Sequence, residues 1–115
     1  FIDEHWTHHA GRWMEWDTYF RSRGVYPRYV SGEGGIVYAA DGVSFNSGKG
    51  WKSCGSFERY LLDIACYNER VLAWNKLHGN RCAGLTLFCY GQWGWDDFEL
   101  GDGEVRMLLD WSKTL

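Results

Sequence analysis

Apolar residues recur at helical spacing in three segments of the chain, and this pattern predicts three helices. In the first segment Trp13, Trp16 and Phe20 follow an i, i+3, i+7 pattern. In the third segment Leu108 and Leu109 fall on one side of the helix. We expect these side chains to face the core or a packed neighbouring helix. The predicted helices cover residues 12–23, 57–78 and 103–113.

Short apolar segments between these helices predict three strands. The run at residues 83–90 is almost continuously apolar, which is typical of a strand buried on both faces of a parallel sheet. Strands that alternate with helices indicate βαβ units. The predicted strands cover residues 1–6, 28–32 and 83–90.

The stretch after the second strand is predicted to be an insertion. Two apolar triplets flank Asp41-Gly42, a pair that favours the tight turn of a β-hairpin. Residues 46–55 are rich in glycine and serine and predict a surface loop. We therefore expect residues 1–115 to form a single α/β domain of three consecutive βα units, with this β-hairpin and glycine-rich insertion after the second strand.

This order of elements matches part of a TIM-type barrel. A complete (β/α)8 barrel needs about 250 residues, whereas this chain has 115. A partial barrel is one interpretation, and an isolated three-stranded sheet with helices is the alternative. In both, ligands are expected beyond the carboxyl ends of the strands, where the βα loops gather.

The composition narrows the classes of partner. Aromatic residues make up 18% of the chain and include 8 Trp, which is more than a core of this size can hide, so some indoles are expected at a surface or in a cleft. A net charge of −3 argues against a nucleic-acid partner, whose phosphates need a basic face. No apolar run reaches the roughly 20 residues of a membrane-spanning helix. We predict neither a nucleic-acid nor a membrane partner.

Cysteine and histidine spacing predicts neither a metal site nor a cofactor. No two of the four cysteines form a C-x-x-C pair, which excludes a zinc ribbon and a thioredoxin-like motif. Reduced, partly buried thiols are favoured over two disulfides. His5 and His9 have the i, i+4 spacing of H-E-x-x-H, but Trp6 stands where that motif has Glu. The sequence also contains no Walker A or G-x-G-x-x-G phosphate loop and no G-x-S-x-G nucleophile elbow.

Polar and aromatic residues follow each predicted strand, so they are expected to share one edge of the sheet. Glu33 stands among glycines, which leave room for a ligand, and we predict that it is a catalytic carboxylate; a solvated turn glutamate is the alternative. Three indoles are predicted to stack on sugar rings, although the alternative is that one of them closes the core. The predicted substrate-binding residues are His5, Trp6, Trp51, Gln92, Trp93 and Trp95.

Three short motifs resemble the last strands of a known enzyme family. They are His5-Trp6, Tyr29-Val30-Ser31-Gly32-Glu33-Gly34-Gly35 and Phe88-Cys89-Tyr90-Gly91-Gln92-Trp93-Gly94-Trp95. On these residues the chain resembles the C-terminal part, about strands six to eight, of a clan A (β/α)8-barrel glycoside hydrolase. The resemblance implies that Glu33 is the nucleophile and that a Trp of the last motif closes a sugar subsite. The acid/base of that family, a Glu after an Asn on the fourth strand, has no counterpart, because Asn68-Glu69 falls inside a predicted helix.

Three hypotheses about function follow. The first is a retaining glycoside hydrolase, or the C-terminal piece of one, whose missing N-terminal barrel strands come from another chain or from a homo-oligomer. The second is a non-catalytic module that binds carbohydrate through its indoles. The third is a self-assembling structural protein whose exposed indoles pack between subunits, because three isolated βα units leave sheet edges and apolar surface uncovered.

Overall fold

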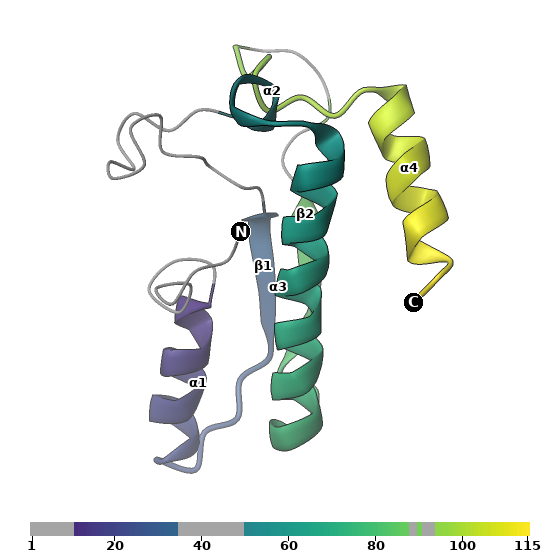
Figure 1. Ribbon diagram of the computed structural model, residues 1–115. Helices are drawn as coiled ribbons and strands as arrows, with labels where there is room; N and C mark the ends of the chain where they lie inside the picture. The colour runs from purple at the N-terminus through teal and green to yellow at the C-terminus, as the bar shows by residue number, and fades with distance from the viewer. Residues whose placement is uncertain (1–10, 35–49, 88–89, 91–93) are drawn as a thin grey trace. The chain divides into compact units, whose positions relative to one another are not determined.

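The computed structural model describes residues 11–34, 50–87, 90 and 94–115. Within this part of the chain, helices account for most of the regular structure (Figure 1). The elements in chain order are α1 (Arg12–Arg21), β1 (Tyr29–Gly34), α2 (Trp51–Cys54), α3 (Phe57–His78), β2 (Cys82–Leu87) and α4 (Asp102–Ser112).

The helical periodicity predicted the positions of the long helices correctly. The three predicted helices correspond to α1, α3 and α4, and α3 has the predicted bounds, Phe57–His78. The hydroxyl of Ser56 accepts the backbone N–H of Arg59 at 3.3 Å, as an N-cap does. At the other end Gly79 has a φ of +83°, the left-handed conformation that commonly follows a helix.

The predicted fold class, three βα units of a TIM-type barrel, is wrong. The described residues form one sheet of two parallel strands, β1 and β2, and a single crossover that includes α3 joins them. The predicted strand at residues 28–32 corresponds to β1, and the strand predicted at residues 83–90 corresponds to β2, Cys82–Leu87. Residues 88 and 89 lie outside the described residues. The predicted strand at residues 1–6 and the hairpin around Asp41-Gly42 lie outside the described residues.

The chain divides into two compact units, each built from two separate stretches of sequence. Unit 1 comprises residues 1–34 and 63–86, and unit 2 comprises residues 35–62 and 87–115. The helix α3 runs through the division, so its first turns belong to unit 2 and the remainder belongs to unit 1.

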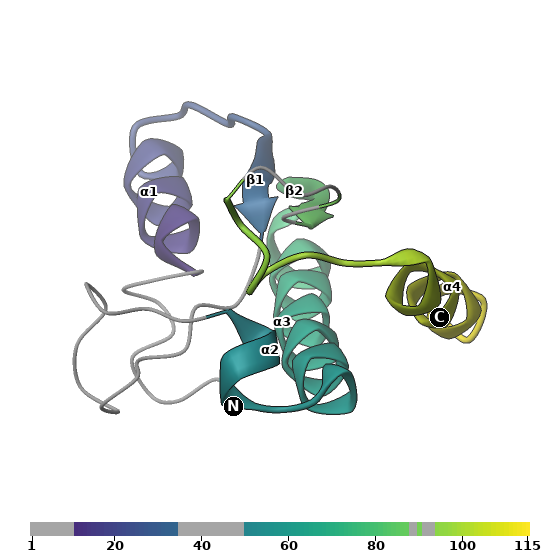
Figure 2. The same cartoon turned by 90° about the horizontal axis from the view of Figure 1, so that it is seen from above.

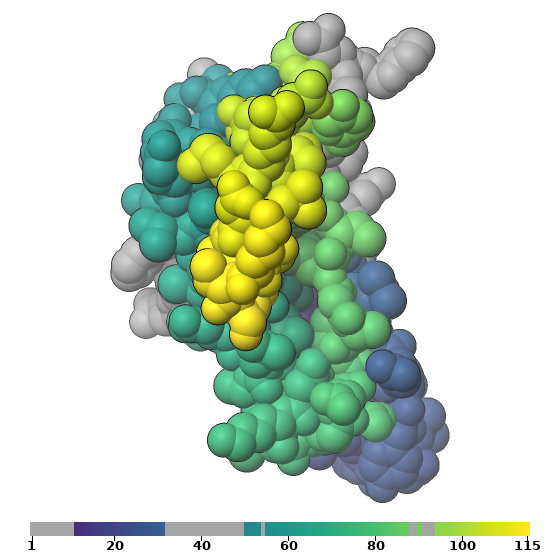
Figure 3. Space-filling model, turned by 90° about the vertical axis from the view of Figure 1, so that its right-hand side faces the viewer, coloured from purple at the N-terminus to yellow at the C-terminus, as the bar shows by residue number. Residues whose placement is uncertain are grey.

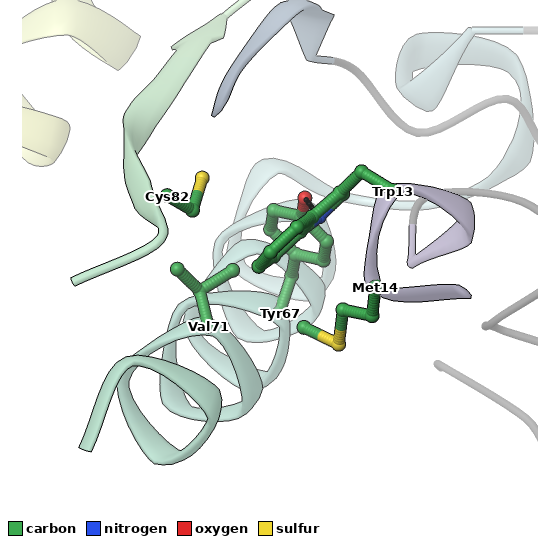
Figure 4. Packing of buried hydrophobic residues seen from close by; sticks show 5 residues of the cluster. All are labelled: Trp13, Met14, Tyr67, Val71 and Cys82. Carbon is green, nitrogen blue, oxygen red and sulfur yellow. Dashed lines mark hydrogen bonds between the residues drawn. The ribbon is translucent and has the colours of Figure 1, made fainter. Parts of the chain in front are cut away.

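The core of unit 1 lies between α1, α3 and β2 (Figure 4). Trp13 and Met14 of α1 meet Tyr67 and Val71 of α3, and Cys82 of β2 completes this buried cluster. The indole Nε1 of Trp13 donates to the hydroxyl of Tyr67 at 3.0 Å, so the polar atoms of both rings are satisfied inside the cluster. Each apolar side chain buried here contributes about 1.5–3 kcal/mol relative to exposure.

The two strands lie side by side with α3 along one side of them (Figure 2). Tyr29 packs against the core cluster, whereas its neighbour Val30 is 65% exposed, because successive strand residues point to opposite faces. The side chain of Asn75 holds the start of β2: its Nδ2 donates to the carbonyl of Cys82 at 2.8 Å, and its Oδ1 accepts the Cys82 N–H at 2.9 Å. This paired contact fixes where the chain leaves α3 and enters the sheet.

The core of unit 2 is aromatic. Trp51 packs on Phe57 and Tyr60, with ring centroids 5.4 Å and 6.2 Å away. The predicted surface loop at residues 46–55 is therefore wrong at residues 51–54, which form the helical turn α2. Residues 46–49 of that loop lie outside the described residues.

The last helix, α4, begins with a local cap. The side chain of Glu104 accepts the backbone N–H of Gly101 at 2.9 Å, which satisfies one of the donors left over at a helix start. No residue of α4 is buried, and Leu109 is 56% exposed, so the expectation that Leu109 faces the core is wrong. Among the described residues, no helix has both the length and the hydropathy required to cross a membrane.

Candidate functional site

The predicted catalytic residue, Glu33, lies near the carboxyl end of β1. The end of β2 is its neighbour in the parallel sheet, and the Thr86 hydroxyl donates to the Ser31 carbonyl at 3.4 Å between the two strands. Ligands of parallel sheets commonly bind beyond this edge. The backbone of Glu33 therefore lies at the edge of the sheet where ligands of parallel sheets commonly bind.

Four of the predicted substrate-binding residues lie outside the described part of the chain. They are His5, Trp6, Gln92 and Trp93. The roles predicted for them stay predictions.

Trp51 belongs to the core of unit 2. Its side chain is 8% exposed, and its Nε1 donates to the carbonyl of Phe98 at 3.3 Å. Because a stacking platform needs an exposed ring face, we do not include Trp51 in the candidate binding surface.

Trp95 is half exposed, at 52%, as expected for one of the two indoles of its motif. A tight turn holds it: the N–H of Phe98 donates to the carbonyl of Trp95 at 2.8 Å, and the two rings meet edge to face with centroids 5.8 Å apart. Gly94, just before it, has a φ of +85°, a conformation that an L residue rarely adopts. The indole is therefore presented at the surface by a fixed turn instead of by burial in the core.

Carboxylates surround this turn in the sequence. Residues 96–104 contain five acidic residues and no basic one. The Asp97 carboxylate accepts the N–H of Gly50 and the hydroxyl of Ser53, so it fixes the turn to α2. Glu99 pairs with Lys52 at 3.3 Å, whereas Asp96 is exposed to solvent.

Tyr90 adds a second exposed ring in unit 2. It is 73% exposed, and its hydroxyl donates to the carboxylate of Asp102 at 3.1 Å. This hydrogen bond to an anion raises the pKa of Tyr90 above its ordinary value. Tyr90, Trp95 and Asp96 are each exposed to solvent in unit 2, and we call this set of residues the unit 2 rim.

The sequence analysis missed a buried polar network in unit 1. Asp17 has no exposed surface, and its Oδ2 accepts Nε1 of Trp74 at 2.9 Å and Nε of Arg21 at 3.0 Å. Asp17 Oδ1 and the buried hydroxyl of Tyr29 have no hydrogen-bond partner among the described residues. Burial raises the pKa of Tyr29, and the nearby negative charge of Asp17 raises it further.

One sequence signal could have revealed this network. Asp17 stands four residues after Trp13 and four before Arg21, on the helix face that is buried. An acidic residue on the buried face of a helix requires a buried partner, since an unpaired buried charge is costly. The network joins α1 to α3 and serves the structure of unit 1.

The described residues contain no group of three His, Cys, Asp or Glu side chains that could hold a metal ion. Cys82 is buried and Cys66 is exposed, and neither forms a disulfide. The unit 2 rim offers rings for stacking and a carboxylate for hydrogen bonding.

Comparison with protein-family models, with curated proteins and with solved structures gave no significant match. The resemblance to clan A glycoside hydrolases therefore depends on the short motifs alone.

Proposed function

We propose that this protein binds carbohydrate through the unit 2 rim, with Trp95 as the stacking residue. The observation that carries the proposal is the half-exposed indole of Trp95 on a turn that hydrogen bonds and ring contacts hold in place. A flat, pre-positioned ring loses little conformational freedom when a sugar face stacks on it. Stacking of a sugar ring on Trp95 therefore requires no rearrangement of the turn.

The polar part of the unit 2 rim suits the other half of a sugar. A pyranose has an apolar face of C–H groups and a perimeter of hydroxyls. The exposed carboxylate of Asp96 accepts hydroxyl hydrogen bonds, and charged acceptors make the stronger ones. The acidic surroundings favour neutral or cationic sugars, because the carboxylate of a uronic acid would be repelled.

The test is binding of soluble hexasaccharides to the whole chain, measured by calorimetry. The probes are cellohexaose, xylohexaose, mannohexaose and chitohexaose. We expect Trp95→Ala to weaken binding of the preferred probe at least tenfold, about 1.4 kcal/mol, and Trp95→Phe to weaken it less. Tyr26→Ala is the matched control, because it removes an exposed ring from unit 1.

Two results would overturn this proposal. One is that none of the four hexasaccharides binds. The other is that Trp95→Ala binds the preferred probe as tightly as the unchanged chain while its circular dichroism is the same.

Glycoside hydrolysis is the second candidate function, and the position of Glu33 at the carboxyl edge of the parallel sheet favours it. A retaining mechanism needs a second carboxyl group about 5–5.5 Å from the nucleophile. Glu33→Gln nearly preserves the shape of the side chain and removes the nucleophile. We expect it to keep sugar binding and to lose turnover of aryl glycosides by several orders of magnitude. No turnover by the unchanged chain, or equal turnover by Glu33→Gln, would exclude this function.

A further inference from the structure

One side of the second half of α1 carries exposed aromatic residues. Trp16 is 55% exposed, Tyr19 is 53% exposed and Phe20 is 38% exposed, so the expectation that Trp16 faces the core or a packed neighbouring helix is wrong. Trp16 stands three positions before Tyr19 and four before Phe20, so the three rings share a side of the helix. Exposed Arg12 and Arg23 stand at the two ends of the same side. We call these five residues the α1 aromatic surface.

The rings of the α1 aromatic surface are ordered among themselves. The guanidinium carbon of Arg23 lies 3.7 Å from the centroid of Tyr19, and Tyr19 meets Phe20 edge to face at 5.5 Å. Exposed apolar surface of this extent on one helix marks an interaction site more often than a solvated face. Its composition of aromatic residues and Arg is the one enriched at protein interfaces.

A second apolar surface lies on α4. Val105, Leu108 and Leu109 stand three and four positions apart and share a side of the helix. Val105 and Leu108 are half-buried, and Leu109 is 56% exposed. Figure 3 shows α4, in yellow, with side chains open to view on one face. We call these three residues the α4 apolar face.

The charges around the two surfaces are opposite. Residues 12–28, which contain the α1 aromatic surface, carry four arginines and two acidic residues. One of these acidic residues, Asp17, is buried and paired with Arg21. Residues 96–115, which contain the α4 apolar face, carry six acidic residues and two basic ones. Two of these acidic residues, Glu99 and Asp110, are paired with Lys52 and Lys113. Complementary charge selects which surfaces meet, and like charges brought together are costly.

We propose that the chain self-associates, with the α1 aromatic surface of one copy packed on the α4 apolar face of another. The aromatic and aliphatic side chains supply the buried apolar area, and the arginines at the ends of the α1 aromatic surface meet the acidic residues around α4. A symmetric contact between two α1 aromatic surfaces would bring Arg12 and Arg23 of both copies together, so it is disfavoured.

This contact joins two different surfaces and leaves one of each unused in a dimer. Association of this kind continues into rings or open chains. The expected particle is therefore larger than a dimer at high protein concentration, and it becomes smaller as salt screens the charges.

The test is sedimentation velocity of the whole chain and two variants over a range of concentrations. The variants are Trp16→Ala with Tyr19→Ala, and Leu109→Ser. All three side chains are more than half exposed, so both variants are expected to fold. Each variant alone should be monomeric, because each lacks one of the two surfaces. An equimolar mixture should form a heterodimer and nothing larger, since only one good pair of surfaces remains.

Each other outcome contradicts the proposal in a defined way. A wild-type chain that is monomeric at every concentration excludes self-association. The same result is expected if the two surfaces are used up within a single chain, so that case also contradicts the proposal. Association of the α4 variant alone, with loss only in the α1 variant, indicates the symmetric α1 contact instead. Association retained by both variants places the interface elsewhere. A variant whose circular dichroism shows unfolding is replaced by Trp16→Gln or Leu109→Gln, read in the same way.

Discussion

Asp17 is the residue on which the packing of α1 against α3 depends most. Its buried carboxylate accepts hydrogen bonds from Trp74 and Arg21, and no part of it reaches solvent. Asp17→Ala would leave the Trp74 indole N–H and the Arg21 guanidinium without their acceptor. We expect a loss of about 3 kcal/mol in the free energy of unfolding, measured by urea denaturation.

The matched control is Asp110→Ala. Asp110 also pairs with a basic residue, Lys113, at 2.7 Å, but both side chains are about three-quarters exposed. Exposed ion pairs contribute little, so the urea midpoint should stay unchanged. Equal effects of the two substitutions would show that burial of the Asp17 pair does not determine its contribution.

Tyr67 links the stability of unit 1 to alkaline pH. Burial raises its pKa above the ordinary 10.0, and hydrogen bonds from Ser31 and Trp13 only partly oppose this. The folded chain therefore holds the phenolic proton more tightly than the unfolded chain does. The stability that this supplies is complete below about pH 10 and is lost as the pH rises above that value.

We expect the urea midpoint of the whole chain to fall as the pH rises above about 10. Tyr67→Phe should be less stable at pH 8, by about 1 kcal/mol, because the Trp13 N–H loses its acceptor, and its decline above pH 10 should be shallower. Tyr26→Phe, at a ring that is 63% exposed, is the control and should keep the decline of the unchanged chain. A decline that is equally steep in Tyr67→Phe would exclude Tyr67 as its source.

At the scale of elements, α2 depends on the absence of a side chain at Gly50. A Cβ at this position would overlap the carbonyl group of Asp97 and crowd the N–H of Phe98. Since these are backbone atoms, they cannot move aside cheaply. Gly50→Ala should separate α2 from the turn at residues 95–98 and reduce stability by at least 2 kcal/mol, a typical overpacking cost.

Gly103→Ala is the control for this substitution. A Cβ at Gly103 meets no atom within 4 Å, and the residue lies in the first turn of α4. Replacing a helical Gly by Ala stabilises by about 0.5–1 kcal/mol. The urea midpoint should therefore fall for Gly50→Ala and rise for Gly103→Ala. The near-ultraviolet circular dichroism of the aromatic side chains should change for Gly50→Ala and stay the same for Gly103→Ala. A Gly50→Ala chain as stable as wild type would contradict the close approach of the two segments.

The helices were predictable from the sequence because their signals are local. Ser56, Gly79 and the apolar spacing between them specify α3 without reference to any other part of the chain. The face of α1 that is buried, in contrast, is determined by contacts with a distant part of the sequence. Trp16 was assigned to the core of α1, whereas Asp17 is buried instead because its partner Trp74 lies 57 residues further along.

The same contrast between local and non-local signals applies to the candidate site. The exposure of Trp95 was predictable from the glycines beside it, which interrupt any core periodicity. Trp51 also stands among glycines, but it is buried because Gly50 lets the backbone approach Asp97, 47 residues away. A close approach between distant segments leaves no pattern in either segment, so the sequence could not distinguish these two indoles.

At the scale of the whole molecule, the two units share chain connections that should make them unfold together. Each unit consists of two separate stretches, so the chain passes between them three times, and one passage is the continuous helix α3. Units of fewer than 70 residues rarely supply more than about 3–5 kcal/mol alone. If one unit unfolds, the stretches of the other unit are no longer held at the ends where they join it. The part of α3 in the unfolded unit also frays.

We therefore expect one urea transition, with the same midpoint for amide protons of α2 in unit 2 and of β2 in unit 1, measured by residue-resolved hydrogen exchange. Leu62→Pro tests the role of α3, because Leu62 lies at the division and is 64% exposed, so the change acts mainly on the backbone. Proline inside a helix costs about 3 kcal/mol, and both midpoints should fall together. Leu72→Ala, at a side chain 55% exposed further along the same helix, should leave both midpoints near those of the unchanged chain. Two separate midpoints in the unchanged chain, or a Leu62→Pro effect confined to one unit, would show that the units are independent and that α3 does not couple them.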